Sequence, residues 1–391
     1  MLHILNLIFF IKIKFLRPKK NEILIIDKLT GKRLLLILNK KKVSFLITRL
    51  SEINVQIFLI AIINKLSNFS LKLSEHYIIS YINSVDPKII ITSNDVIYFF
   101  WKLKNYFPDK KVIIFQNNYR NGWDFGNIFL KSKTKKTGLC DLFVTYCNSI
   151  VPLYSKRIKS KYLSIGSIEN NFFRKKFNNK RKTIVYISQF KNWPDDWSAK
   201  GENRRKILLK DSYIKSDKIV LNFLHKFCEK NNKELKIFLR NEEGDLVSKE
   251  IKYYEEILNY KIKFINKKNR FQGYKKISNY DFFVTIDSTL GYECLARGKK
   301  VAFFNNRYSV SKFKNGNQHY YGWPKNFGKS GLFWTDSIKT EKMQKVLNFL
   351  LKSTSPEWSK AKKKYVDGVI DYDYKNKRLI QSLNDIFKKS N

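Results

Sequence analysis

Short runs of β-branched and aromatic residues alternate with segments of helical periodicity along most of the chain, an order typical of parallel α/β proteins. Six of these runs are expected to form strands in the first half, at 22–27, 43–48, 88–93, 111–116, 142–146 and 162–167. Residues 53–66 and 95–106, which lie between them, have the apolar spacing of helices. Because the runs are continuous and not alternating, we expect both faces of the sheet to be covered.

The same pattern restarts after a polar, basic segment, 170–182, which has the character of a linker. Five further strands are expected at 183–189, 235–241, 261–266, 281–288 and 300–305, and helices near 216–230, 247–259, 289–297 and 340–352. The pattern therefore predicts two Rossmann-like, doubly wound α/β domains, 1–175 and 176–391. The second includes a charged helical tail, 357–391, of a kind that often crosses back to the first domain. In such folds ligands bind at the carboxyl ends of the strands.

The first twenty residues, MLHILNLIFFIKIKFLRPKK, have an apolar stretch but differ from a signal peptide. Their basic residues follow the apolar stretch, and a small-residue cleavage site is missing. Lys12 and Lys14 interrupt the stretch, which leaves it too short to span a bilayer. We expect an amphipathic first helix at the membrane interface. The run at 57–64 has the length of a core helix, so we expect no transmembrane segment.

Composition adds charge to this picture. Lys and Arg number 77 against 33 Asp and Glu, a net charge of +44 that favours anionic partners such as phosphorylated substrates or an acidic membrane. The lysines are spread along the whole chain, however, as the bias of an A/T-rich genome would also produce. A nucleic-acid-binding protein is disfavoured, because the chain has no helix-turn-helix, zinc-finger or RNA-binding strand signature.

The four cysteines show no CxxC pairing and are expected to be buried free thiols in a reducing compartment. The histidines are too scattered for a zinc site. GxGxxG and P-loop motifs are absent from the sequence, which argues against dehydrogenases and P-loop kinases. A DxD motif in a convincing context is also absent, so we expect neither a metal nor a cofactor.

The segment 281–307 is the strongest candidate for chemistry. Its strand ends at Asp287, and Ser288 and Thr289 stand where the next helix begins. Hydroxyls and backbone N–H groups at a helix N-terminus can bind phosphate, although the same residues often serve as a simple cap. Glu293, four residues after Thr289, is placed on the same helix face to bind ribose hydroxyls.

Polar residues also end the neighbouring strands of the second domain. Arg240 ends the strand at 235–241, where an arginine fork could grip phosphates or be simply solvated. Ser188 and Gln189 follow the first strand and could meet the nucleotide or begin a loop.

In the first domain, polar residues follow three strands at the edge where ligand sites gather. Asp27 and Glu52 are the leading candidates for a carboxylate base, which glycosyl transfer to a hydroxyl needs. Gln116 is a third candidate for the catalytic site. For Asp27 a structural role is the alternative, because an Asp at the end of a strand more often caps a turn. Further candidates are Asp124 as a third base, Arg49, and, for the acceptor, Asn117 and Arg120.

Two aromatic loops complete the candidates. His319 lies in NGNQHYYGWPKNFG, which is either a substrate-ordering lid or a packed surface loop. The tryptophans of 193–197 either stack on a base or sugar or simply pack.

Several runs of the sequence resemble a family of bacterial surface carbohydrate biosynthesis proteins. They are TIDSTLGYECLARGKKVAFF (285–304), IIFQNNYRNG, YLSIGSIENN and GLFWT, together with the opening ILIIDKLTGKRL and TRLSEINV. The resemblance covers nearly the full chain, with Asn118 as a departure where the family's pattern has glycine. It implies a GT-B fold, two Rossmann-like domains that bind acceptor and nucleotide sugar respectively. In outline it is similar to transferases that use CMP-linked ulosonic acids.

The resemblance implies a cytoplasmic glycosyltransferase that builds a surface glycan such as lipopolysaccharide or capsule. Its partners would be a nucleotide-sugar donor and a glycan or lipid-linked acceptor at the inner membrane. Three alternatives stay open on the same fold: a polyol-phosphate transferase, a sugar epimerase and a catalytically inactive scaffold of the same pathway.

Overall fold

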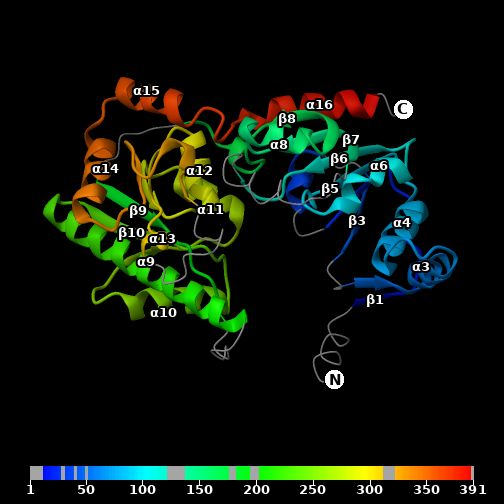
Figure 1. The fold of residues 1–391 in the computed structure, drawn as a ribbon, viewed down its shortest axis with the longest axis horizontal. Coiled ribbons are helices and arrows are strands. Elements are labelled where there is room, and N and C mark those ends of the chain that lie inside the picture. The colour runs from blue at the N-terminus through cyan, green and yellow to red at the C-terminus, as the bar shows by residue number, and fades with distance from the viewer. Residues whose placement is uncertain are drawn as a thin grey trace.

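The computed structural model describes residues 12–27, 31–38, 42–48, 52–120, 137–175, 182–193, 202–310 and 322–388. Its two main sheets each have six parallel strands and lie side by side, one in each half of the molecule (Figure 1). Helices cover both faces of the sheets.

The first sheet has the flavodoxin-like order β3-β2-β5-β6-β7-β8. Its strands are β2 (Ile23–Ile26), β3 (Val43–Leu46), β5 (Ile89–Thr92), β6 (Lys111–Phe115), β7 (Gly138–Thr145) and β8 (Ile158–Ser164). Its helices are η1 (Lys32–Leu36), α3 (Val55–Ser67), α4 (Leu73–Val85), α5 (Tyr98–Trp101), α6 (Leu103–Tyr106), η2 (Asn148–Ile150), α8 (Val151–Ser155) and η3 (Asn170–Phe172). The strand order reverses between β2 and β5.

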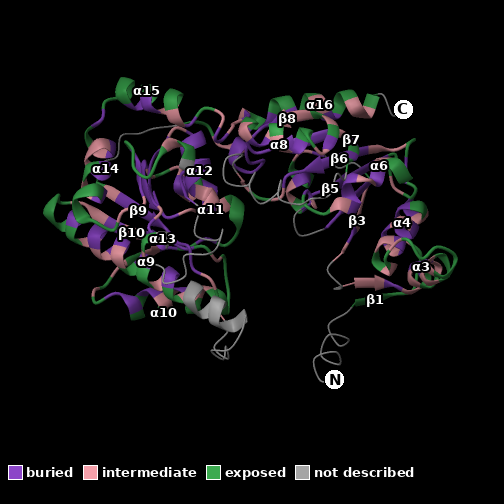
Figure 2. Cartoon of the chain, in the orientation of Figure 1, coloured by how far each residue is buried: buried purple, intermediate pink, exposed green. Residues whose placement is uncertain are grey.

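The second sheet has the order β11-β10-β9-β12-β13-β14, that of a dinucleotide-binding Rossmann fold. Its strands are β9 (Thr183–Ile187), β10 (Glu234–Phe238), β11 (Lys263–Ile265), β12 (Phe282–Thr285), β13 (Lys300–Phe304) and β14 (Trp334–Thr335). Its helices are α9 (Glu202–Lys230), α10 (Asp245–Ile257), α11 (Arg270–Ile277), α12 (Thr289–Ala296), α13 (Arg307–Val310), η5 (Lys325–Phe327), α14 (Thr340–Lys352) and α15 (Ser355–Tyr365). Here the order reverses between β9 and β12. In the two sheets, the central strands β2, β5, β12 and β13 are buried along their whole length, whereas the edge strands β3, β8 and β11 are only partly buried (Figure 2).

These topologies confirm the predicted fold, a GT-B-like pair of doubly wound sheets with a helical C-terminal end. The four cysteines are buried and free, as predicted. The predicted helix at 95–106 is two short helices, α5 and α6. Among the described residues, none of the helices combines the length and apolar character needed to cross a bilayer.

The expected amphipathic first helix is wrong over residues 12–14, which form the strand β1 (Lys12–Lys14). β1 pairs in parallel with β4 (Glu52–Asn54) in a separate two-stranded sheet. The alternation Lys-Ile-Lys has the period of two that is typical of a strand, and β4 provides the backbone partners for its hydrogen bonds. Residues 1–11 lie outside the described part of the chain.

The C-terminal segment leaves the second sheet and returns to the first. α16 (Lys377–Lys388) lies along the first half of the molecule (Figure 1). Its Leu379 and Leu383 are buried in the same core as β2 and β5. α16 therefore completes the first sheet, although in sequence it follows the second.

The chain thus crosses between the halves twice, at 165–175 and at 366–376, and the two crossings are bonded to each other. Asn171 donates to Oδ1 of Asn376 at 2.8 Å, and Asn376, at the end of η6 (Tyr374–Asn376), donates to the carbonyl of Ile168 at 3.0 Å. Gly166 has a φ of 76°, and a Cβ there would lie 2.0 Å from the carbonyl oxygen of Asp371. Glycine is what allows the two crossings to approach so closely.

Candidate functional site

A cavity of about 410 Å³ opens at the carboxyl ends of β9, β10 and β12. Its position is the point where the order of the second sheet reverses, which is where ligands bind in open α/β sheets. It is lined by all seven residues predicted to bind the nucleotide: Ser188, Gln189, Arg240, Asp287, Ser288, Thr289 and Glu293. The structure thus brings together residues that lie more than a hundred positions apart.

The N-terminus of α12 forms one wall of this cavity. Ser288 caps the helix, because its hydroxyl accepts from the N–H of Leu290 at 3.3 Å. Gly291 lets the helix lie close to β12, since a Cβ there would be 2.6 Å from the methyl group of Thr285. The first turn of a helix presents N–H groups without intrahelical partners, together with the positive end of the helix dipole. This wall is suited to a phosphate.

The carboxylate of Asp287 is held from behind. One oxygen is ion-paired with Arg307, whose side chain is buried. The amide of Gln189, oriented so that all its polar atoms are satisfied, donates to Asp287 Oδ1 at 2.7 Å and accepts from the N–H of Ser288 at 2.7 Å. Asp287 and Gln189 therefore fix the turn that leads into α12.

Glu293 lies deeper in the cavity, with 1% of its surface exposed. Its Oε2 accepts from the hydroxyl of Tyr274 at 2.8 Å, and its Oε1 has no hydrogen-bond partner among the described residues. Burial raises the pKa of this carboxyl group, and the nearby Arg270 opposes the rise. A buried acceptor without a partner, on the wall of a cavity, is suited to a ligand hydroxyl.

Three cationic side chains also line the cavity. The ammonium group of Lys267 donates to the carbonyls of Leu239 and Arg240, both at 2.6 Å, and burial lowers its pKa to about 8. Arg240 donates to the carbonyl of Phe190 at 3.0 Å and is otherwise exposed. With Arg270 they give the cavity a positive character that matches an anionic ligand.

Ser188 is engaged in the protein itself. Its hydroxyl bonds the carboxylate of Glu250 and accepts from Tyr254 at 2.8 Å. Glu250, fully buried, also accepts from the N–H groups of Arg240 (2.7 Å) and Asn241 (2.9 Å). Glu250 thus ties the ends of β9 and β10 together, a role that sequence reasoning missed because it depends on Ser188, which lies 62 residues away in the chain.

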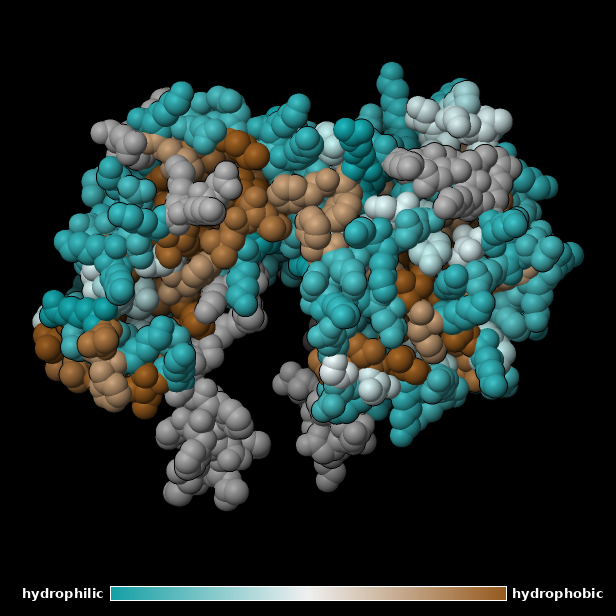
Figure 3. All heavy atoms as spheres, turned by 180° about the vertical axis from the view of Figure 1, so that it is seen from behind, coloured by the Kyte–Doolittle hydropathy of each residue, from teal (hydrophilic) through white to brown (hydrophobic). Residues whose placement is uncertain are grey.

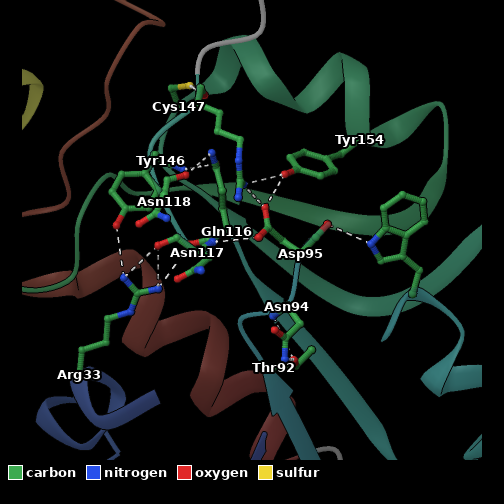
Figure 4. A network of polar contacts seen from close by, with 12 residues as sticks. Arg33, Thr92, Asn94, Asp95, Gln116, Asn117, Asn118, Tyr146, Cys147 and Tyr154 are labelled. Carbon is green, nitrogen blue, oxygen red and sulfur yellow. Dashed lines mark hydrogen bonds and ion pairs between the residues drawn. The ribbon is translucent and has the colours of Figure 1, made fainter. Parts of the chain in front are cut away.

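In the first domain, Gln116 and Asn117 follow β6 and belong to a polar network (Figure 4). The Gln116 side chain accepts from the N–H of Tyr146 and donates to the carbonyl of Asn118, both at 2.9 Å. Both ends of its amide are therefore bound to backbone, and Gln116 shapes the turn after β6. The side chain of Arg33, on η1, donates to the hydroxyl of Tyr146 at 3.2 Å.

Arg120 is ion-paired with Asp95, a buried residue at the end of β5 that sequence reasoning missed. The hydroxyl of Tyr154 donates to the same carboxylate at 2.5 Å, and the N–H of Asn117 donates to its other oxygen at 3.2 Å. Asp95 therefore holds the loop that carries the predicted acceptor residues.

The two predicted bases lie in different places. Asp27 is buried just after β2, where the order of the first sheet reverses, with a φ of 74°. Glu52 lies on the β1–β4 sheet and pairs with Lys14 at 2.5 Å, apart from the other candidates. Three further candidates, Arg49, Asp124 and His319, lie outside the described residues, and so do residues 194–197. Of the two tryptophans at 193–197, Trp193 is described, and it packs edge-on against Tyr213.

The two halves meet beside the cavity. Asn118, from the first domain, is one of its lining residues. The rings of Tyr119 and Tyr292 stack across the junction with centroids 4.0 Å apart, and Asn170 donates to the carbonyl of Glu293 at 3.0 Å. The cavity at the ends of β9, β10 and β12 is therefore in contact with the loop after β6. Within the described residues, His, Cys, Asp and Glu form no group of three able to hold a metal ion.

Comparison with known proteins shows that most of the chain matches one protein family. The model of a family described as "putative O-antigen biosynthesis protein" matches residues 113–387. No curated protein matches the chain. The match covers the second sheet, the last strands of the first and the returning C-terminal helix.

Several solved structures are similar to this chain at low sequence identity. One is the Gap123 glycosylation-associated protein complex of Streptococcus agalactiae (12% identity, TM-score 0.41). The match covers 80% of this chain and 58% of that chain. Another is the UDP-GlcNAc 2-epimerase of Methanocaldococcus jannaschii (9% identity, TM-score 0.49), with 96% of this chain and 100% of that chain covered. A third is the wall teichoic acid polymerase TagF (10% identity, TM-score 0.45), with 95% and 89% covered.

Proposed function

The chain belongs to this O-antigen biosynthesis protein family, and from that premise we propose that it is a metal-independent glycosyltransferase. It would transfer a sugar from a nucleotide-activated donor, such as a CMP-linked sugar, to a growing surface glycan. The observation that carries the proposal is the cavity at the end of the second sheet, which joins a helix N-terminus, cationic side chains and a buried carboxyl group.

In this proposal the donor phosphate binds at the N-terminus of α12, against Ser288 and Thr289, and Arg240 closes on it from β10. The free Oε1 of Glu293 accepts a hydrogen bond from a ribose hydroxyl. The positions support this assignment because all four residues line one cavity. A phosphate is favoured at one end of that cavity by the helix dipole.

The acceptor would enter over the first domain, near Asn117, Asn118 and Arg120. Its hydroxyl oxygen attacks the anomeric carbon while the bond from that carbon to the phosphate oxygen breaks. The nucleotide leaves with the electron pair, and the hydroxyl proton passes to a carboxylate. We assign that carboxylate to Asp27, because it lies at the switch point of the first sheet. Glu52 is already paired with Lys14.

The acceptor is proposed to be lipid-linked, which would place the protein on the cytoplasmic side of the inner membrane. The net charge of +44 supports attraction to anionic lipid headgroups. No cofactor takes part in the proposed reaction, and nucleic acid has no role in it.

The test is nucleotide binding by the full-length protein. Thermal unfolding is followed with CMP, CDP, UDP, GDP and their sugar conjugates, since a ligand that binds only the folded state raises the melting temperature. At about a hundred times its Kd it adds about 2.7 kcal/mol to the free energy of unfolding. We expect a clear shift with one nucleotide class, and at least about tenfold weaker binding in Glu293→Gln, which replaces the acceptor oxygen.

The matched control is Glu256→Gln, an exposed carboxylate on α10. It should bind the nucleotide as the unchanged protein does. If no nucleotide shifts the melting temperature of a cooperatively unfolding protein, the donor site is refuted. The inactive scaffold then becomes the better account.

A further inference from the structure

The outer face of α3 carries large apolar side chains that the protein does not cover. Leu59, Ile63 and Leu66 are 55%, 62% and 65% exposed. Their spacing of four and three residues puts them on one face of the helix. The opposite face is the one that packs, with Ile57 and Ala61 buried and the helix resting on α4. A single exposed leucine means little, but a row of three on one helix marks an interaction surface.

The segment that includes β1 extends this row. Ile13, Phe15 and Leu16 are 53%, 68% and 85% exposed. The side chain of Asn54, the N-cap of α3, donates to the carbonyl of Leu16 at 2.6 Å, which fixes the segment beside the start of the helix. We call these six residues the N-terminal apolar face. Hydrophobic spheres gather at the lower left of Figure 3, over the part of the first domain that holds α3.

Positive charge surrounds this face. Residues 12–20 and 52–71 contain six Lys or Arg and one carboxylate, Glu52. That carboxylate is bound to Lys14 at 2.5 Å. Lys12, Arg17, Lys19 and Lys20, which neighbour Ile13, Phe15 and Leu16 in the chain, are exposed. Apolar side chains ringed by cations have the character of a protein surface that inserts shallowly into a bilayer interface.

We propose that the N-terminal apolar face docks on an anionic lipid bilayer. The apolar side chains enter the boundary between headgroups and acyl chains, and the surrounding cations bind lipid phosphates. Charge selects a lipid surface over a second copy of the chain: the exposed cations match anionic headgroups, whereas two copies with a net charge of +44 each would repel one another.

The proposal identifies the membrane-binding surface of the proposed transferase, but its evidence is independent of the donor site. α3 and β1 contribute no residue to the cavity at β9, β10 and β12. Membrane binding is therefore measured without nucleotide. A protein that binds vesicles but no nucleotide would refute the proposed function alone.

The experiment is sedimentation of the full-length protein with phosphatidylcholine vesicles that do or do not contain about 30 mol % phosphatidylglycerol. We expect binding to the anionic vesicles, weakened by high salt because the headgroup contacts are screened. The triple variant Leu59→Gln, Ile63→Gln, Leu66→Gln should lose at least about tenfold in partition coefficient, since its apolar contribution is removed. Arg17→Gln with Lys19→Gln and Lys20→Gln should weaken binding to anionic vesicles in particular.

The matched control replaces three exposed apolar residues of the second domain, Leu246, Leu332 and Ile338, by glutamine. It should bind vesicles as the unchanged protein does. Circular dichroism and the melting temperature check that each variant is folded. Unchanged vesicle binding in the folded α3 variant overturns the proposal. So does a dimer in solution that the α3 variant dissociates, which would assign the face to a second copy.

Discussion

At the scale of single residues, a buried carboxylate lies behind the cavity. Asp217, on α9, is 1% exposed and accepts from the hydroxyls of Tyr186 at 2.6 Å and Tyr253 at 2.8 Å. Burial raises its pKa to about 6 from 3.8, and the tyrosine hydroxyls oppose the rise. The folded state therefore holds this proton at pH values where the unfolded state has released it.

This residue predicts a pH dependence of stability. Between about pH 4 and pH 6 the folded protein binds more protons at Asp217, so its contribution lowers the free energy of unfolding as the pH rises, by about 3 kcal/mol in all. Asp217→Asn should remove that part of the slope. Urea unfolding at pH 4, 5, 6 and 7 measures it. Asp211→Asn, an exposed residue of the same helix, should leave the slope unchanged; equal slopes in both variants would contradict the assignment.

Sequence reasoning identified residues that line the cavity because their signals are local. Asp287, Ser288 and Glu293 follow a strand end and a helix start that are visible in a few letters, and the structure brings them into one cavity. Glu250 and Asp95 escaped because their partners lie distant in sequence: Ser188 is 62 residues from Glu250, and Arg120 is 25 from Asp95. The sequence did not show that Glu52 lies on a separate strand, β4, which pairs with β1 and not with the main sheet.

At the scale of elements, continuous apolar runs predicted every strand of the two main sheets except the short β14, whereas the strand orders and their reversal points come from the structure. The helices α4 and α11 were not predicted. The return of α16 to the first sheet agrees with the expectation that the C-terminal tail crosses back, although the sequence did not identify the strands that it contacts. Local periodicity defines a helix but not the sheet on which it packs.

The position of α16 predicts which of its residues hold the first domain together. Leu379 is fully buried in the core with β2 and β5, whereas its neighbour Ile380 is 36% exposed. Leu379→Ala should lower the free energy of unfolding by about 2–5 kcal/mol, because it leaves a cavity. Ile380→Ala should change it by less than about 1 kcal/mol. Chemical denaturation of both variants measures the difference, and equal losses would mean that α16 does not belong to this core.

At the scale of the whole molecule, the cavity of the second sheet reaches the loop after β6 through Asn118 and the stack of Tyr119 on Tyr292. Filling the cavity should therefore steady residues of the other domain. In the presence of the nucleotide that binds, we expect slower amide exchange at 117–120 as well as at 288–293. Tyr119→Ala should reduce the effect at 117–120 and leave that at 288–293. Protection confined to the second sheet would show that the domains respond independently.

The two crossings of the chain have a mechanical consequence. A single covalent link would let one domain swivel about the other, but here two segments run across the junction and are bonded through Asn171 and Asn376. Such a paired link resists twisting of one domain against the other. Bending of the two domains about one axis is then the motion that meets the least resistance. Displacement then grows with distance from the link, so that the far rim of the cleft moves farthest for a given rotation. A small rotation at the two crossings is converted into a larger change in the opening between the domains.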